Sequence, residues 1–598
     1  MLANVSARLS GNALLFFACA PVPMLKIPQR LILLLSFFIL PLVFLEAAEP
    51  AKDLGRPNFV IVFCDDLGWS DIGCYGSEIE TPNIDSLAER GMRFTQAYNT
   101  CRCCPSRASL LTGLWSHQAG IGMMVYRDSG PGYEGNLSEN VVTFADALGQ
   151  DGYQTMMVGK WHVGHRAERA HPEKHGWQKF TGIYSHIDSY WNLLPGSPIH
   201  RDGKLWIPAG REPENPYRPG EDFYTTEFFT DVALDYIDQA AERKKPFVLH
   251  LCYNVPHFPL ETPDELIKKY QGKYLDGWDE LTKQKIVRQV TMGLHAPKAN
   301  FKRNQSFANV HISSEIQQRF GMPKNAIPRW EKLGKQAQRE LDFRRAMYAG
   351  QVDNLDQNVG RLVQRLKQRG VLDNTVILFL SDNGCSGETG DFGMNWGNYL
   401  ESNYSEWKKK SGWSISQGAC WAAYSNAPFR MYKKFVHEGG ISTPLIVHWP
   451  AGLDNPGRIE KNAVVHLVDV FPTLMELSGA EQPNERNGVE VPKLVGESFA
   501  DHIQDATTQA NPRTLFWQHE NHSAIRDGDW KLVTFNDRRE DGWELYQVHG
   551  GERPDRGETR NLAKKHPDRV KAMKAKWREW AESVNALPFP EQRSLPAK

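Results

Sequence analysis

The residues best suited to chemistry stand directly after short apolar runs that read as strands. Four such runs end in polar residues: Asp65 and Asp66, Lys160 and His162, His257, and Asp382 and Asn383. In open α/β sheets, ligands bind in the crevice beyond the carboxyl ends of the parallel strands. We therefore expect these side chains, which come from segments more than 300 residues apart, to converge on one edge of a sheet.

The acidic members of this set predict a cation site. Asp65, Asp66 and Asp382 would repel one another in a shared site unless a cation neutralised them, and Asn383 adds an amide oxygen. A donor set made only of oxygen favours Ca²⁺ or Mg²⁺ over Zn²⁺, which would recruit His or Cys. Of the two we predict Ca²⁺, because these ligands tolerate a loose coordination geometry.

The elements that must position these residues read as alternating strands and helices. Strands are predicted at 59–63, 247–253, 376–380 and 445–449, and helices at 82–91 and 347–366. Such alternation predicts an α/β fold with a mostly parallel sheet covered by helices on both faces. The polar stretch 270–330 is interpreted as an irregular surface insertion.

The texture changes after about residue 480. Strands at 523–533 and 543–548, joined by turns rich in Asp, Gly and Arg, precede an amphipathic helix at 567–580. We therefore predict three regions: a leader at 1–48, a catalytic domain at 49–480 and a smaller C-terminal α+β subdomain at 481–598.

Composition bounds the class of protein. The 598 residues include 70 Lys and Arg against 71 Asp and Glu, and 41% are hydrophobic. A core can form, whereas a net charge of −1 argues against nucleic acid as the main partner, since phosphate binding needs an excess of basic residues.

The N-terminus is typical of an export signal. Lys26 and Arg30 precede an apolar run at 31–45, and the small residues at 46–49 offer a cleavage site. The run is too short for a convincing membrane span, so a signal peptide is favoured and no stable span is expected. Translation could truly begin at Met24. The mature protein is then expected in the periplasm or outside the cell.

Three cysteines crowd into Cys101-Arg102-Cys103-Cys104, and no second Cys or His pair follows at zinc-ligand spacing. From Cys103 to Gly113 the chain resembles the type I sulfatases, nearest the bacterial arylsulfatases, whose signature is Cys-x-Pro-Ser-Arg followed by Leu-Thr-Gly. Further segments at 428–430, 433, 437–440 and 464–479 are similar to that family. The resemblance covers nearly the whole mature chain.

That resemblance implies an alkaline-phosphatase-like α/β/α sandwich with a C-terminal subdomain. It implies that a dedicated maturation enzyme oxidises Cys103 to formylglycine. By position it implies one Ca²⁺ per chain, with Asp65, Asp66, Cys103, Asp382 and Asn383 as ligands. Arg107, Lys160, His162, His257 and Lys433 match the residues of the family's sulfate site. Cys104 stands at the variable position of the signature, where it could perturb maturation or form a disulfide.

The implied reaction is hydrolysis of a sulfate monoester to an alcohol and inorganic sulfate. One hydroxyl of the formylglycine hydrate attacks sulfur, and the second then loses its proton, so that the aldehyde reforms and sulfate leaves. Arg107 would lie within one turn of a helix beginning near Pro105, where it stabilises the nucleophile. His257 is assigned as the acid and His162 as the base, although the two roles could be exchanged.

Two other functions stay open at this point. The first is a phosphate or phosphonate ester hydrolase on the same fold, and the second is a non-catalytic protein that binds sulfated glycans. The substrate is expected to be a sulfated small molecule or glycan, with pocket walls at 188–206 and 399–421, which are rich in Trp, Tyr and Ser.

Overall fold

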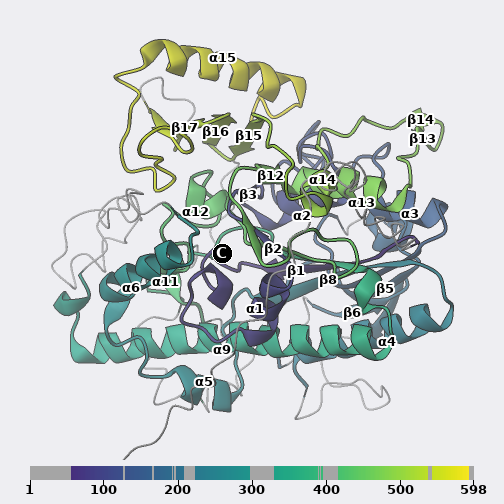
Figure 1. Ribbon diagram of the computed structural model, residues 1–598, viewed down its shortest axis with the longest axis horizontal. Coiled ribbons are helices and arrows are strands. Elements are labelled where there is room, and N and C mark those ends of the chain that lie inside the picture. The colour runs from purple at the N-terminus through teal and green to yellow at the C-terminus, as the bar shows by residue number, and fades with distance from the viewer. Residues whose placement is uncertain are drawn as a thin grey trace, which may run out of the picture. The chain divides into compact units, whose positions relative to one another are not determined.

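The strands predicted at 59–63, 247–253 and 376–380 lie side by side in the middle of a ten-stranded sheet (Figure 1). Its order is β11 (Arg458–Glu460), β2 (Met92–Phe94), β10 (Leu445–His448), β9 (Thr375–Ser381), β1 (Asn58–Asp65), β8 (Phe247–Pro256), β4 (Gln154–Lys160), β5 (Lys179–Ile183), β6 (Ile199–Arg201) and β7 (Lys204–Ile207). The central run from β9 to β5 is parallel, as is the β11–β2 pair, and the remaining pairs are antiparallel. The parallel centre confirms the predicted α/β class.

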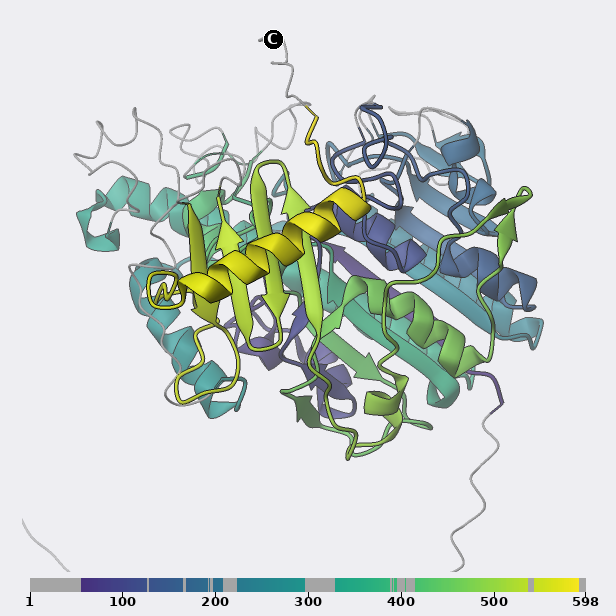
Figure 2. The same ribbon diagram turned by 90° about the horizontal axis from the view of Figure 1, so that it is seen from above.

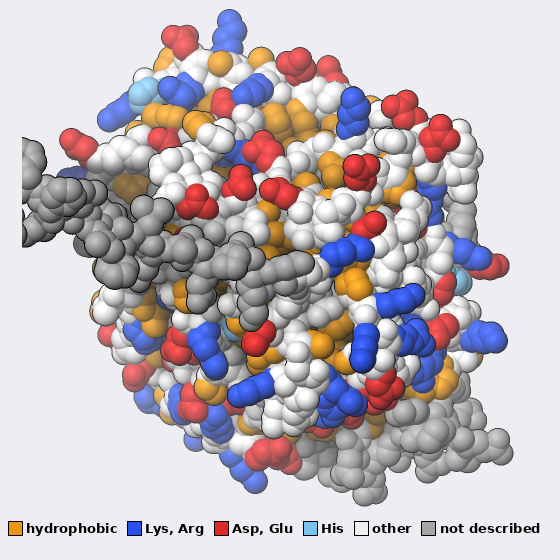
Figure 3. Space-filling view, turned by 45° about the vertical axis from the view of Figure 1, so that its right-hand side comes forward, with side chains coloured by type: hydrophobic (Ala, Val, Ile, Leu, Met, Phe, Trp, Pro, Cys, Tyr) orange, Lys and Arg blue, Asp and Glu red, His pale blue; other side chains and the backbone are white. Residues whose placement is uncertain are grey.

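This computed structural model describes residues 55–590, apart from 126–127, 165–167, 192, 194–196, 208–222, 296–328, 388–389, 391, 395–403, 405–414 and 536–541. The predicted leader at 1–48 lies outside the described residues. Within the described part, no helix has both the length and the apolarity that crossing a membrane requires. Acidic and basic side chains are both spread over the face shown in Figure 3, in keeping with the near-zero net charge.

Helices cover both faces of the sheet because the buried strands are apolar on both sides. Val60 and Val62 of β1 pack into a core with α1 (Pro82–Glu89), α4 (Thr225–Glu242) and α9 (Lys335–Gln368). Ile61 and Phe63 pack into a second core with α2 (Cys103–Thr112), α3 (Phe144–Gln150) and α13 (Val470–Ser478). Period-two side-chain alternation therefore builds the sandwich.

The C-terminal region contains a four-stranded antiparallel sheet, and in Figure 2 its strands lie side by side behind the yellow helix α15 (Pro567–Ser583). Its strands are β15 (Thr514–His519), β16 (His522–Asp527), β17 (Trp530–Thr534) and β18 (Trp543–Gln547). The predicted strand at 523–533 is two strands, because Gly528 and Asp529 turn the chain between them. Strand β15 was not predicted. Where the subdomain begins, placed at 481 from the sequence, stays a prediction.

The prediction of an irregular insertion at 270–330 is wrong for its first part, and 296–328 lies outside the described residues. Helix α5 (Asp264–Tyr270) is followed by α6 (Gly277–Thr291). On α6 the buried positions include Trp278, Lys285 and Gln289. Because two of these are polar, no apolar periodicity marked the helix in the sequence.

A buried acid joins the antiparallel sheet to the main sandwich. Glu438, the first residue of α12 (Glu438–Ile441), is fully buried, with Lys531 Nζ 3.0 Å from Oε1 and Arg556 Nε 2.9 Å from Oε2. Lys531 also lies 2.9 Å from Glu558 Oε1. Burial alone would raise the pKa of Glu438, yet Lys531 and Arg556 hold it at about 2. The carboxylate therefore stays charged and fixes both elements.

We expect Lys531→Met to lower the free energy of unfolding by about 3–5 kcal/mol, because the two acids lose the cation that compensates their burial. The matched control is Lys576→Met, which removes an exposed pair with Asp527 and should cost about 1 kcal/mol or less. Urea unfolding followed by tryptophan fluorescence measures both. Equal losses in the two variants would contradict a special role for the buried cluster.

Candidate active site

The four polar strand ends meet because their strands are neighbours. In the order β9, β1, β8, β4, the carboxyl ends carry Asp382, then Asp65 and Asp66, then His257, then Lys160 and His162. Asp66 and His162 have left-handed backbones, with φ of 66° and 58°. Non-glycine residues seldom adopt this conformation, because it raises the free energy of the backbone. Residues held in it are found mainly at functional sites.

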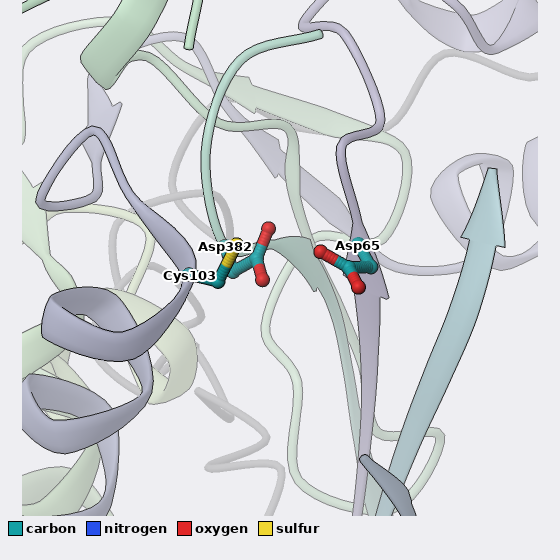
Figure 4. A group of neighbouring side chains, drawn as sticks. All are labelled: Asp65, Cys103 and Asp382. Carbon is teal, nitrogen blue, oxygen red and sulfur yellow. The ribbon is translucent and has the colours of Figure 1, made fainter. Parts of the chain in front are cut away.

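Helix α2 brings the signature to the same edge. Cys103 is the first residue of α2, two residues earlier than predicted, after an extended Arg102. The sulfur of Cys103 and one oxygen each of Asp65 and Asp382 lie within 4.8 Å of one another, and Figure 4 shows the three side chains converging. Burial raises the pKa of the Cys103 thiol to about 12, so unmodified cysteine is a neutral thiol here. Its sulfur marks where the oxygen of a formylglycine side chain would stand.

Each carboxylate in the site faces a cation of the chain. Lys160 Nζ lies 2.5 Å from Asp65 Oδ2, Arg107 Nη2 lies 2.8 Å from Asp382 Oδ2, and Lys433 Nζ lies 2.8 Å from Asp66 Oδ1. Burial alone would raise the pKa of Asp65, but Lys160 holds it well below its usual range. Burial and the negative charge of Asp65 raise the pKa of Asp382 to about 7.

The positively charged side chains of the site do not provide a hydrogen bond to every oxygen of its acidic and amide groups. Asp65 Oδ1, Asp66 Oδ2 and Asn383 Oδ1 are buried and have no hydrogen-bond partner in the described residues. The Asn383 amide donates to Asp66 Oδ1 over 2.6 Å, which turns its carbonyl oxygen elsewhere. Buried carboxylate oxygens left without donors are costly, and a hard divalent cation satisfies such a set. These residues therefore fit a metal ion.

The two histidines differ in their surroundings. His257 Nδ1 lies 2.6 Å from the Phe258 carbonyl oxygen, which only accepts, so Nδ1 carries a proton. Its Nε2 lies 3.5 Å from Asp66 Oδ2. His162 has no hydrogen-bond partner on either ring nitrogen within the described chain. Burial, then the charge of Lys160, lowers its pKa well below the usual value.

A cavity of about 290 Å³ opens above these groups. Its walls comprise Arg102, Cys103, Met124, His162, His186, Ile187, Asp188, His257, Phe258, Pro259 and Lys433. Among the predicted wall residues, Asp188 does line this cavity. Trp421 does not, because it is buried and donates its indole N–H to the Leu341 carbonyl; most of 399–421 lies outside the described residues.

All ten residues singled out from the sequence thus lie at one edge of the sheet. The walls Arg102, Met124, His186 and Phe258 were missed, although Arg102 and Phe258 adjoin predicted residues. The described cysteines are all free thiols, and Cys104 Sγ lies 3.6 Å from Met124 Sδ, so Cys104 forms no disulfide here.

Three cations lie beside the acidic strand ends, and one of them, Lys433, also lines the cavity together with Cys103 at the N-terminus of α2. Such an arrangement suits an enzyme that acts on an anionic ester. Residues 57–480 match the Sulfatase family model, and 429–582 match the model described as N-sulphoglucosamine sulphohydrolase, C-terminal. The chain belongs to the sulfatase family. It is a sulfuric ester hydrolase, and its family generally uses formylglycine and a divalent metal.

Named relatives span most of the chain. It is 30% identical over 569 residues to an uncharacterized sulfatase of Schizosaccharomyces pombe, covering 90% of this chain and 95% of that protein. It is 32% identical over 455 residues to the arylsulfatase of Klebsiella aerogenes, covering 74% and 90%. A solved protein in complex with its substrate D-glucosamine-2-N,6-O-disulfate is 21% identical with a TM-score of 0.57, covering 90% of this chain and 100% of that one, which shows the shared fold.

Chelation is expected to lower the melting temperature of the wild type by several degrees, because a ligand that binds only the folded state stabilises it. Re-addition of a divalent cation should restore the melting temperature. Asp382→Ala should lose turnover by orders of magnitude and should no longer respond to the chelator. Scanning calorimetry and a sulfate-release assay measure these effects. Full activity in a thoroughly chelated wild type would contradict the metal site.

Proposed function

We propose that this sulfatase hydrolyses sulfate monoesters of a saccharide after a maturation enzyme has converted Cys103 to formylglycine. The observation that carries the proposal is the placement of residue 103. It opens α2 between Asp65 and Asp382, and it lines the same cavity as His162, His257 and Lys433. A nucleophile there faces both the acidic cluster and the pocket.

We further propose Ca²⁺ as the metal, held by Asp65, Asp66, Asp382, Asn383 and the oxygen of residue 103. The buried oxygens of this set that have no hydrogen-bond partner in the described residues favour a hard cation. Bound there, a divalent cation supplies positive charge that polarises sulfate oxygens and lowers the pKa of a neighbouring hydroxyl. An exported enzyme, as the leader suggests, would meet calcium in excess.

The chain's own cations then act on the substrate. Lys160 and Lys433 lie beside the acids and can neutralise sulfate oxygens as charge develops, while Arg107 holds Asp382 and faces the nucleophile from α2. His257, with its Nδ1 proton held by Phe258, directs Nε2 toward the site and is assigned to the leaving alcohol oxygen. His162 is assigned to the second hydroxyl of the hydrate, whose deprotonation releases sulfate; the two assignments could be exchanged.

The cavity favours a single sulfated sugar ring as the substrate. About 290 Å³ is at the small end of ligand pockets. The apolar walls Met124 and Phe258 suit the C–H face of a ring, whereas Asp188 is an acceptor for hydroxyl groups. Asp188 is held by His186 Nε2 at 3.1 Å and by Ser197 Oγ at 3.1 Å. A relative from Bacteroides thetaiotaomicron that is named N-acetylglucosamine-6-O-sulfatase, 26% identical over 559 residues, supports a sugar substrate.

Conversion of Cys103 should set activity. Protein expressed without a maturation enzyme should fold but be nearly inactive, and activity should scale with the converted fraction, because a thiol cannot form a geminal diol. Cys103→Ala and Cys103→Ser should be inactive, whereas Cys104→Ala should still be converted, since the signature leaves that position open. Mass spectrometry of the tryptic peptide ending at Arg107, with parallel aryl sulfate and aryl phosphate assays, measures this. Full sulfate turnover with Cys103 entirely thiol would refute the mechanism.

Asp188→Asn should lower kcat/KM for a hydrolysable monosaccharide sulfate about 10- to 100-fold relative to 4-nitrophenyl sulfate, which carries no hydroxyls. The physical reason is the loss of a charged acceptor that a sugar hydroxyl would use. The surface variant Asp231→Asn serves as the control. Sulfate release measured by ion chromatography gives the ratio for each variant. An unchanged ratio would argue against sugar recognition by Asp188.

A further inference from the structure

A buried network of hydrogen bonds and ion pairs holds the loop that carries Asp66. None of the residues in this network has been assigned a role in the reaction. Immediately after β1, the chain turns through Asp66 and runs to Asp71, which is fully buried. The hydroxyl of Tyr348, on α9, lies 2.7 Å from Asp71 Oδ2, 3.3 Å from the Asp66 carbonyl oxygen and 3.5 Å from the Gly68 nitrogen. One hydroxyl therefore touches three points of the loop.

Asp71 is itself fixed by Arg345, one turn before Tyr348 on the same helix. Arg345 Nη2 lies 2.8 Å from Asp71 Oδ1, and its Nη1 donates to Ser425 Oγ over 2.7 Å. Its guanidinium lies over the Tyr348 ring at 4.8 Å from the centroid. Lys285 of α6 stands 3.8 Å from the same Asp71 oxygen. These side chains are fully buried. Their hydrogen bonds and ion pairs are therefore stronger than they would be in contact with water.

Space around the loop is also fixed. A Cβ on Gly68 would stand 2.5 Å from both Asp71 Oδ2 and the Ser425 carbonyl oxygen. Ser70 donates from both its backbone nitrogen and its hydroxyl to that carbonyl. The loop therefore cannot move closer to Ser425, at the end of α11 (Gly418–Ser425), without a clash, and it cannot move away without losing the two hydrogen bonds of Ser70.

Asp66 needs such support because its backbone is strained. Its φ of 66° places a side-chain-bearing residue in the left-handed region. Its carboxylate meets Lys433 and the Asn383 amide, and its own N–H lies 3.3 Å from Asp382 Oδ1. A relaxed loop would carry the carboxylate away from Asp382 and from the cation site.

We propose that Tyr348 and Asp71 are positioning residues that hold the Asp66 backbone in its left-handed conformation and so set the affinity of the cation site. The inference rests on the cation assignment made in the proposed function. Neither residue touches the substrate pocket described above. Mutation of residues that orient metal ligands typically weakens metal binding about 10- to 100-fold.

The test compares Tyr348→Phe with Tyr253→Phe by titrating chelated full-length protein with Ca²⁺ in a calorimeter. Tyr253 is also fully buried and its hydroxyl pairs with Thr230 Oγ at 2.7 Å, but it touches no residue of the Asp66 loop in the described contacts. Tyr348→Phe should bind Ca²⁺ about 10- to 100-fold more weakly than the wild type. Tyr253→Phe should stay within about twofold of it.

Activity supplies a second readout. In Tyr348→Phe, kcat measured on 4-nitrophenyl sulfate at low Ca²⁺ should fall and should recover at saturating Ca²⁺, while KM stays near that of the wild type. A defect of packing alone would not respond to the cation. Asp71→Asn, which keeps the shape but removes the charge, should show the same weakening and is the substitute if Tyr348→Phe does not fold.

Equal Ca²⁺ affinity in Tyr348→Phe, Asp71→Asn and the wild type would overturn the inference alone. An equal loss of affinity in Tyr348→Phe and Tyr253→Phe would also overturn it, since buried hydroxyls in general would then be responsible. A wild type that binds no cation would overturn the cation assignment as well, and the two failures are therefore distinguishable.

Discussion

Repulsion among three buried carboxylates is the constraint on which the rest of the structure depends. Asp65, Asp66 and Asp382 are fully or almost fully buried at adjoining strand ends, and unpaired charges in such surroundings cost several kcal/mol each. Three cations from distant segments offset these charges: Arg107 on α2, Lys160 on β4 and Lys433 in the loop after α11 (Gly418–Ser425). The carboxylate and amide oxygens that these cations leave without a hydrogen bond are the ones that fit a metal ion.

The same charges suit the chemistry of a sulfate ester. The lysines that offset the acids also border the cavity or the nucleophile, so a dianion-like transition state finds positive charge already in place. A site that is preorganised in this way need not rearrange during reaction. The strained backbones at Asp66 and His162 indicate how firmly the surrounding packing holds it.

Buried ion pairs also join the outer parts of the molecule to this edge. Glu438 ties the C-terminal sheet to α12, and the Gly440 carbonyl of α12 accepts from the Gly384 nitrogen, next to Asn383. On the other face, Arg345 and Tyr348 tie α9 to the loop of Asp66. Only one or two contacts separate each of these ion-pair networks from the proposed metal ligands. The loss of either network should therefore displace the ligands.

The sequence by itself determined the elements whose signals are local. Strands β1, β8 and β9, the terminal helix and the polar residues at the strand ends could all be predicted, because apolar runs, turns and motifs are written in consecutive residues. The signature from Cys103 to Gly113 identified the family and the candidate nucleophile. The sequence placed Arg107 within one turn of a helix beginning near Pro105, whereas α2 begins two residues earlier, at Cys103.

Only the tertiary structure decided which distant groups meet. Helix α6 was missed because Lys285 and Gln289 occupy its buried face, and their partners lie more than 130 residues away. The walls Met124 and His186 and the supports Asp71 and Tyr348 likewise have no signal in their own neighbourhoods. Pairing between elements depends on strand order and helix packing, which bring together residues that no local spacing relates.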